Sequence, residues 1–206
     1  MLDYFFSPYK NYPIYEIVLE ITAIVFGLIS VWFAKKNSIL VFPTGLINTS
    51  IYVFLLYKWS LLGDMLINGY YFIMSLYGWH QWSRKNNKLQ VYPIAKISNN
   101  EIYISFQLFC ISIFFVVIVY LFFNKFTTWM AYLDTLITGI FFVGMWLMAK
   151  RKIENWICWI IGNIISIPLY FAKGYAFTSI QYIIFTIIAV FGYLEWKKIL
   201  NNNQQV

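Results

Sequence analysis

Long apolar runs separated by short polar and basic segments dominate the sequence. There are seven runs of roughly 17–23 residues, and each is long enough to cross about 30 Å of hydrocarbon as a helix. They cover approximately residues 15–34, 39–57, 62–82, 101–123, 127–149, 156–172 and 175–196. None shows the short alternation of a transmembrane strand, and lipid cannot satisfy free backbone polar groups. The pattern therefore predicts an all-α integral membrane protein with seven transmembrane helices.

The composition supports that class. Hydrophobic residues make up 61% and charged residues 11% of the chain, whereas a soluble domain carries about 45–50% and about 25%. The first dozen residues lack the basic start and small-residue cleavage site of a signal peptide. Cys110 and Cys158 lie inside apolar runs without metal-ligand spacing, which predicts two core thiols.

Basic residues lie unequally on the two sides of the predicted helices. Eleven of the fifteen follow the odd-numbered runs: Lys35, Lys36, Arg84, Lys85, Lys88, Lys96, Lys150, Arg151, Lys152, Lys197 and Lys198. The other side keeps Lys10, Lys58, Lys125 and Lys173. The richer side is expected to be cytoplasmic, with the N-terminus outside and the C-terminus inside. The net charge of +7 then reflects topology in a lipid bilayer and requires no nucleic-acid partner.

The chain also repeats itself at an offset of roughly 114–117 residues. EITAIVFGLISVWFAKK (Glu20 to Lys36) resembles DTLITGIFFVGMWLMAKRK (Asp134 to Lys152), and YGWHQWSRK resembles FGYLEWKK. Runs 1–3 and 5–7 are therefore predicted to be two copies of one three-helix unit, made parallel by a single connector helix. The predicted parts are an extracytoplasmic segment 1–14, a first bundle 15–82, a cytoplasmic loop and connector 83–126, a second bundle 127–198 and a cytoplasmic tail 199–206.

Polar residues inside the runs mark the candidate site. Each is costly in lipid and usually faces the interior, and parallel repeats are an architecture of secondary transporters with a site between the repeats. Run six carries its polar and aromatic residues on one helical stripe, and run three carries a second stripe. The candidate lining is Trp156, Trp159, Asn163, Tyr170, Asp64, Asn68, Tyr71, Gln181, Tyr182 and Asn48. Glu20 and Asp134 occupy matched places in the two repeats and are predicted to be a structural or gating pair.

These residue types indicate the ligand chemistry. Amides donate and accept hydrogen bonds without a fixed charge, while Trp and Tyr faces attract flat rings and cations. A carboxylate at Asp64 adds attraction for positive charge. No basic residue lies within any run, so a phosphate would not be neutralised. We therefore expect an unphosphorylated heterocycle–sugar conjugate.

The stripe of run six carries a family resemblance. WICWIIGNIISIPLY (Trp156 to Tyr170) matches the W-x-x-W-x-x-x-N-x-x-x-x-x-x-Y pattern of the Pnu family of bacterial vitamin transporters, and Phe42 to Trp82 resembles that family's spans two and three. The resemblance covers roughly residues 15–198. It implies a SWEET-like three-plus-one-plus-three fold in the bacterial inner membrane, and a homotrimer. It also implies transport of nicotinamide riboside by facilitated diffusion, as in PnuC-type members. A cytoplasmic kinase then phosphorylates the riboside and so traps it in the cell, and no direct complex between the kinase and the transporter is implied.

The resemblance leaves the vitamin open. Asn68 stands where many members carry Gln, and Phe42 where Trp is common. Relatives transport thiamine or riboflavin, so thiamine is the alternative substrate. Coupling to protons or sodium through Glu20, Asp64 or Asp134 also stays open.

Simpler roles compete for several of these residues. An interfacial aromatic belt would also explain Trp156, Trp159 and Tyr170. Asn163 would also serve as an interhelical hydrogen bond, and Asp64 as a helix-start acid. An enzyme is disfavoured because the sequence has no Ser-His pair, metal-spaced cluster or nucleotide-binding glycine loop. No cofactor is expected.

Overall fold

Long helices account for almost all of the structure. The computed structural model describes residues 13–59, 62–86, 89–90, 93–124, 126–174 and 176–203. The helices are α2 (Ile14–Lys35), α3 (Val41–Lys58), α4 (Leu62–Ser83), α5 (Asn99–Phe122), α6 (Trp129–Ala149), α7 (Asn155–Ala172) and α8 (Ala176–Asn203). Each predicted run is helical, with ends that differ by a few residues. Only α8 differs more: it continues to Asn203 because no proline or glycine interrupts the chain after Lys197.

The segment after α4 departs from the all-helical prediction. It forms a short antiparallel pair, β1 (Lys85–Asn86) and β2 (Leu89–Gln90). Two residues per strand are too few to produce a visible alternation of polar and apolar positions. Lys10, Lys88 and Lys125 of the orientation argument, and the first twelve residues of the predicted N-terminal segment, lie outside the described residues.

The helices differ in how apolar they are. Within the described residues, α2, α5, α6 and α7 are long and apolar enough to cross a membrane by length and composition alone. The other three carry more polar residues, such as Asn48 in α3, Asp64 in α4 and Gln181 in α8.

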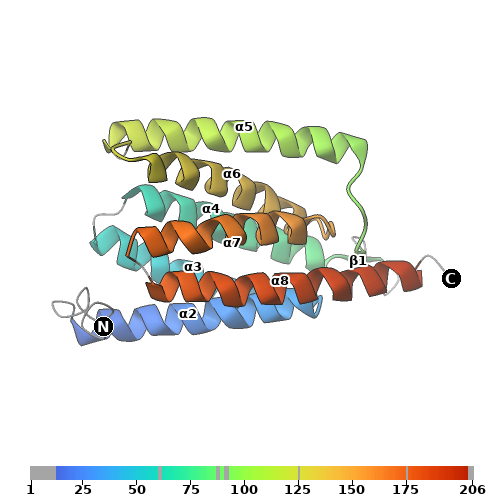
Figure 1. The fold of residues 1–206 in the computed structure, drawn as a ribbon. Helices are drawn as coiled ribbons and strands as arrows, with labels where there is room; N and C mark the ends of the chain where they lie inside the picture. The colour runs from blue at the N-terminus through green and yellow to red at the C-terminus, as the bar shows by residue number, and fades with distance from the viewer. Residues whose placement is uncertain are drawn as a thin grey trace.

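Contacts between neighbouring helices close six of them into a ring. α5 lies outside this ring, along one edge of the molecule (Figure 1). Within the ring, α3 packs between α2 and α4, and α7 packs between α6 and α8. The ring closes where α2 meets α8 and where α4 meets α6. α5 packs along α6 at one edge of the molecule (Figure 1). Cys110, predicted to be a core thiol, is exposed on α5 because only one side of this helix has a neighbour, while Cys158 is half-buried.

The helices α2, α3 and α4 make up one three-helix group of the ring, and α6, α7 and α8 make up the other. The first helix of each group ends in the same way. Asn37 after α2 and Arg151 after α6 both have left-handed backbone, with φ of 51° and 54°. The next N–H in each turn donates to the carbonyl five residues earlier, at 2.9 Å in both cases. This is the left-handed cap that commonly ends helices. The two residues are 114 positions apart, which is the predicted repeat offset.

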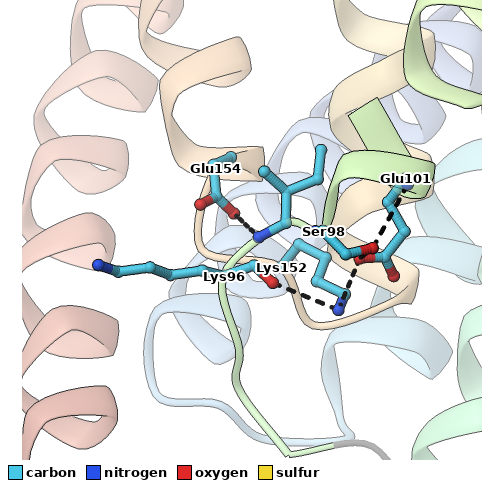
Figure 2. A network of polar contacts seen from close by, with 6 residues as sticks. Lys96, Ser98, Glu101, Lys152 and Glu154 are labelled. Atoms are coloured by element: carbon cyan, nitrogen blue, oxygen red, sulfur yellow. Dashed lines mark hydrogen bonds and ion pairs between the residues drawn. The ribbon is translucent and has the colours of Figure 1, made fainter. Parts of the chain in front are cut away.

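The start of α5 is tied to the turn between α6 and α7 (Figure 2). Ser98 and Glu101 form a capping box at the start of α5. Glu101 Oε2 also pairs with Lys152 Nζ at 2.9 Å. The Ile97 N–H donates to Glu154 Oε2 at 3.0 Å. These contacts fix the connector helix against the second three-helix group.

Candidate functional site

A cavity of about 1370 Å³ lies inside the helix ring. All of the candidate residues line it, although they come from four helices: Asn48, Asp64, Asn68, Tyr71, Trp156, Trp159, Asn163, Tyr170, Gln181 and Tyr182. Glu20 and Asp134 line it as well. The polar stripes of α4 and α7 therefore face one space. Contact of these residues with a ligand stays a prediction.

Aromatic rings form one wall of the cavity. Trp159 and Phe141 have ring centroids 5.2 Å apart. Phe141 is nearly parallel to Tyr182, at 6.4 Å and 13°, and Tyr182 lies 5.1 Å from Tyr170. The wall offers flat faces of the kind that stack on a heterocycle.

Amide side chains complete the lining. Asn48 on α3 and Asn163 on α7 are 115 residues apart and both line the cavity. Asn48 Nδ2 donates to Ala23 O on α2 at 2.7 Å, and Asn68 Nδ2 donates to Asp64 O at 3.0 Å. An amide offers two N–H donors and a carbonyl acceptor. One such bond therefore leaves capacity for a ligand.

Charged residues gather at one end of the cavity. Glu20, Asp64, Asp134 and Lys173 line it where α2, α4, α6 and α8 begin, and we call this the acidic end. The sequence placed no cation within a run, whereas the structure brings Lys173, just after α7, into the lining. This lysine pairs with Asp134, so its charge is compensated. Within the described lining, the excess of carboxylates favours a positively charged ligand.

Two ion pairs occupy corresponding places at the acidic end. Lys58 lies 115 positions before Lys173 and pairs at 3.5 Å with Glu16, one turn before Glu20. Each three-helix group thus ties the start of its first helix to the end of its second. In this contact Glu16 corresponds to Asp134, whereas in sequence position Glu20 corresponds to Asp134.

Loss of the Asp134 carboxylate is expected to destabilise the second three-helix group. Asp134→Asn keeps the shape and leaves the half-buried Lys173 ammonium uncompensated. We expect the free energy of unfolding to fall by about 1–3 kcal/mol. Thermal unfolding in detergent measures the change. The double variant Asp134→Asn/Lys173→Gln should recover most of it, and equal loss in both variants would contradict a role for the ion pair.

Burial separates the competing roles of the aromatic residues. Trp156 is 1% exposed, so it is a packed residue and not part of an exposed interfacial belt. Its ring meets Trp196 edge-on at 5.5 Å and 88°. Trp159 and Tyr170 are half-buried and line the cavity. Asp64 lies in the first turn of α4 and also lines the cavity, so both of its predicted roles are compatible with its place.

The sequence interpretation missed one face of α6. Phe141, Met145 and Met148 follow Asp134 at i+7, i+11 and i+14, and all four line the cavity. This spacing defines one helical stripe. The search for polar residues overlooked it because an apolar stripe in a membrane helix resembles every other face. Its alignment with Asp134 was the available signal.

Comparisons with known proteins agree with this geometry. The sequence profile of the nicotinamide mononucleotide transporter family matches residues 17–198. The nicotinamide riboside transporter PnuC of Escherichia coli (strain K12) is 25% identical over 205 residues, covering 86% of this chain and 84% of that protein. The riboflavin/roseoflavin transporter RibM of Streptomyces davaonensis is 23% identical over 181 residues, covering 84% and 81%.

A solved structure shares the fold. The crystal structure of the vitamin B3 transporter PnuC superimposes with a TM-score of 0.67 at 22% identity, and the match covers 89% of this chain and 82% of that chain. The family profile spans most of the sequence. The chain therefore belongs to the nicotinamide mononucleotide transporter family, and it is a multi-pass transporter of the bacterial inner membrane, not an enzyme.

Proposed function

We propose that the protein carries nicotinamide riboside into the cytoplasm. The observation that supports this most is the single cavity in which aromatic faces, amides and carboxylates meet. Nicotinamide riboside combines a flat cationic ring, a carboxamide and ribose hydroxyls. The ring stacks on Trp159 with Tyr71 or Tyr182 opposite, and Asn163 and Asn68 bind the carboxamide or the hydroxyls.

The acidic end of the cavity argues for the riboside over the mononucleotide. A phosphate would meet Glu20, Asp64 and Asp134, while the single cationic lining residue of the described chain, Lys173, is already paired with Asp134. Like charges in a partly dehydrated site repel strongly. The positive ring of the riboside is attracted instead.

The proposed architecture is the SWEET-like three-plus-one-plus-three arrangement, with all seven helices crossing the membrane. Residues 15–82 and 127–198 form two parallel bundles, and α5 connects them. The N-terminus lies outside and the C-terminus in the cytoplasm, as the distribution of lysine and arginine favours. Assembly as a homotrimer belongs to the same proposal.

Transport follows facilitated diffusion with alternating access. One three-helix bundle rocks against the other, so the cavity faces each side of the membrane in turn. Phosphorylation of the riboside in the cytoplasm then prevents its return, because the charged product no longer fits the cavity. The transporter and the kinase need not touch.

Two other vitamins remain alternatives. The relative RibM is a riboflavin/roseoflavin transporter, which favours riboflavin as a second candidate. Thiamine is the third, since it also carries a positive heterocycle. Riboflavin is neutral and gains nothing from the carboxylates at the acidic end.

Ligand binding to the purified protein distinguishes these candidates. Nicotinamide riboside, thiamine, riboflavin and nicotinamide mononucleotide are titrated in detergent while tryptophan fluorescence is followed. We expect saturable quenching by nicotinamide riboside, weakened by added salt because the carboxylates are screened. Saturation by thiamine or riboflavin alone would move the protein to that substrate. No response to any ligand would contradict the site.

A further inference from the structure

Two tryptophans join the three-helix groups at the end opposite the acidic one, which we call the basic end because Lys35, Lys150 and Arg151 lie there. Trp82 Nε1 on α4 donates to Ala149 O, the last residue of α6, at 3.1 Å. Trp196 Nε1 on α8 donates to Ala34 O in the last turn of α2 at 3.0 Å. Both acceptors lie in the last turn of a helix, where carbonyls have no i+4 N–H partner within the helix; Ala34 O also accepts from the Asn37 N–H at 2.9 Å. The bonds are reciprocal, since each runs from the third helix of one group to the first helix of the other.

The packing around the two indoles repeats as well. Phe42 meets Trp82 edge-on at 5.0 Å and 88°, and Trp156, 114 positions later, meets Trp196 in the same way. The two indoles lie 6.1 Å from each other. Each of the two outer rings, Phe42 and Trp156, packs against a glycine. An added Cβ at Gly78 would lie 2.2 Å from the Phe42 ring, and one at Gly192 would lie 2.6 Å from the Trp156 ring. The cluster is therefore closely packed on both sides of the interface.

The cavity ends where this cluster begins. At the acidic end, the exposed residues Asp64 and Thr128 line it. At the other end, its last lining residues on α4 and α8 are Ser75 and Ala189, which are 3% and 1% exposed. Each tryptophan lies seven residues further along its helix, about 10 Å at 1.5 Å per residue. The structure is therefore open toward the acidic end and closed at the basic end.

Arg151 covers the cluster from the basic side. Its guanidinium carbon lies 4.0 Å from the centre of the Trp82 ring, and the residue is 2% exposed. Burial lowers the pKa of Arg151 to about 10, so it stays charged at neutral pH. By contrast, the Glu16–Lys58 and Asp134–Lys173 ion pairs at the acidic end each lie within one group. The reciprocal tryptophan bonds hold the two groups to each other at the basic end.

We propose that Trp82 and Trp196 form the gate at the basic end, and that both bonds break when the cavity opens to that side. Because the two bonds cross between the groups in opposite directions, rocking one group against the other lengthens them together. Opening is then a single two-state event for both bonds. This inference rests on the proposed alternating access and does not depend on which vitamin is carried.

Labelling of an engineered cysteine tests the gate without any ligand. Cys110 and Cys158 are replaced by alanine, and Ala189→Cys serves as the reporter in sealed membrane vesicles. A charged, membrane-impermeant thiol reagent is added from the basic side. The double variant Trp82→Phe/Trp196→Phe keeps one aromatic ring at each position and removes both N–H donors together with the five-membered ring. We expect the labelling rate from the basic side to rise about tenfold, since each bond contributes a factor of about two to ten.

A matched control and a second reporter sharpen the result. Trp79→Phe makes the same change at an exposed position of α4 outside the cluster, and it should leave labelling unchanged. Ser75→Cys is the repeat-equivalent reporter and should respond like Ala189→Cys. If the double variant does not fold, Trp196→Phe alone should raise the rate about threefold. Unchanged labelling in folded variants, or an equal rise in Trp79→Phe, would overturn the gate.

The outcome separates the gate from the substrate. A labelling response in a protein that binds none of the four vitamins would support the gate and reject the proposed substrate. Binding of nicotinamide riboside without a labelling response would support the proposed substrate and reject the gate.

Discussion

Replacing Asn163 with leucine is expected to abolish uptake of nicotinamide riboside while the amount of protein in the membrane stays the same. Asn163 is 3% exposed, lines the cavity and lies one helical turn beyond Trp159. Leucine has a similar volume but offers no donor or acceptor to the ligand. Loss of the bonds to a dehydrated carboxamide or hydroxyl would weaken binding by about 1.5–3 kcal/mol, roughly 10- to 100-fold.

Uptake of labelled riboside and titration of the purified variant measure this effect. Asn100→Leu is the matched control, because it makes the same change at an exposed position of α5 away from the cavity. Normal uptake by Asn163→Leu would remove this residue from the site. Loss of protein from the membrane would instead indicate the structural hydrogen bond that competes with the ligand role.

A methyl group at Gly162 is expected to destabilise the transporter. An added Cβ would lie 2.2 Å from Phe141 Cε1, so the ring must move toward the cavity or α7 must shift. Overpacking of this kind lowers the free energy of unfolding by about 1–3 kcal/mol. A displaced Phe141 would also disturb the aromatic wall, so riboside binding should weaken as well.

The matched control for this change is Gly69→Ala. An added Cβ at Gly69 meets nothing within 4 Å. Because alanine favours a helix over glycine, this variant should gain about 0.5–1 kcal/mol. Thermal unfolding in detergent compares the two. Equal stability of Gly162→Ala and Gly69→Ala would show that α6 and α7 are packed less tightly than the contact implies.

The sequence was sufficient to predict the helices. Long apolar runs leave no other regular structure available in lipid, so hydropathy places α2, α5, α6 and α7. The more polar α3, α4 and α8 were recognised as further runs between basic or polar segments. The ends were less certain, as α8 shows by continuing to Asn203. β1 and β2 were not predicted, because a two-residue ladder is held by local backbone hydrogen bonds that leave no sequence period.

The sequence predicted the polar, tryptophan and tyrosine residues of the candidate site, but not its purely apolar residues. Asn68 and Asn163 stood out because amides are rare in membrane helices. Phe141 and Lys173 did not stand out: one looks like any apolar residue, and the other lies just beyond a run. Their place in the lining depends on how α6 and α7 turn toward the ring, which is set by tertiary packing.

The family resemblance added information that composition lacked. The repeat and the polar stripes indicated a transporter for a flat polar molecule without naming it. The pattern from Trp156 to Tyr170 indicated the family, and the family profile confirms it. The family alone does not identify the vitamin, because relatives include both nicotinamide riboside and riboflavin/roseoflavin transporters.

The repeat has a further consequence for how one ligand orients. The proposed two-fold relation between the repeats would offer an asymmetric molecule two opposite poses of nearly equal energy. Among the lining residues, Asn68 corresponds to Tyr182 and Tyr71 corresponds to Phe185 at the repeat offset of 114 positions, and each unlike pair removes some of this degeneracy. A difference of about 1.4 kcal/mol already gives a tenfold preference for one pose. We therefore expect that a substitution in one half alone redirects the pose, and with it the selectivity, without any change in the fold.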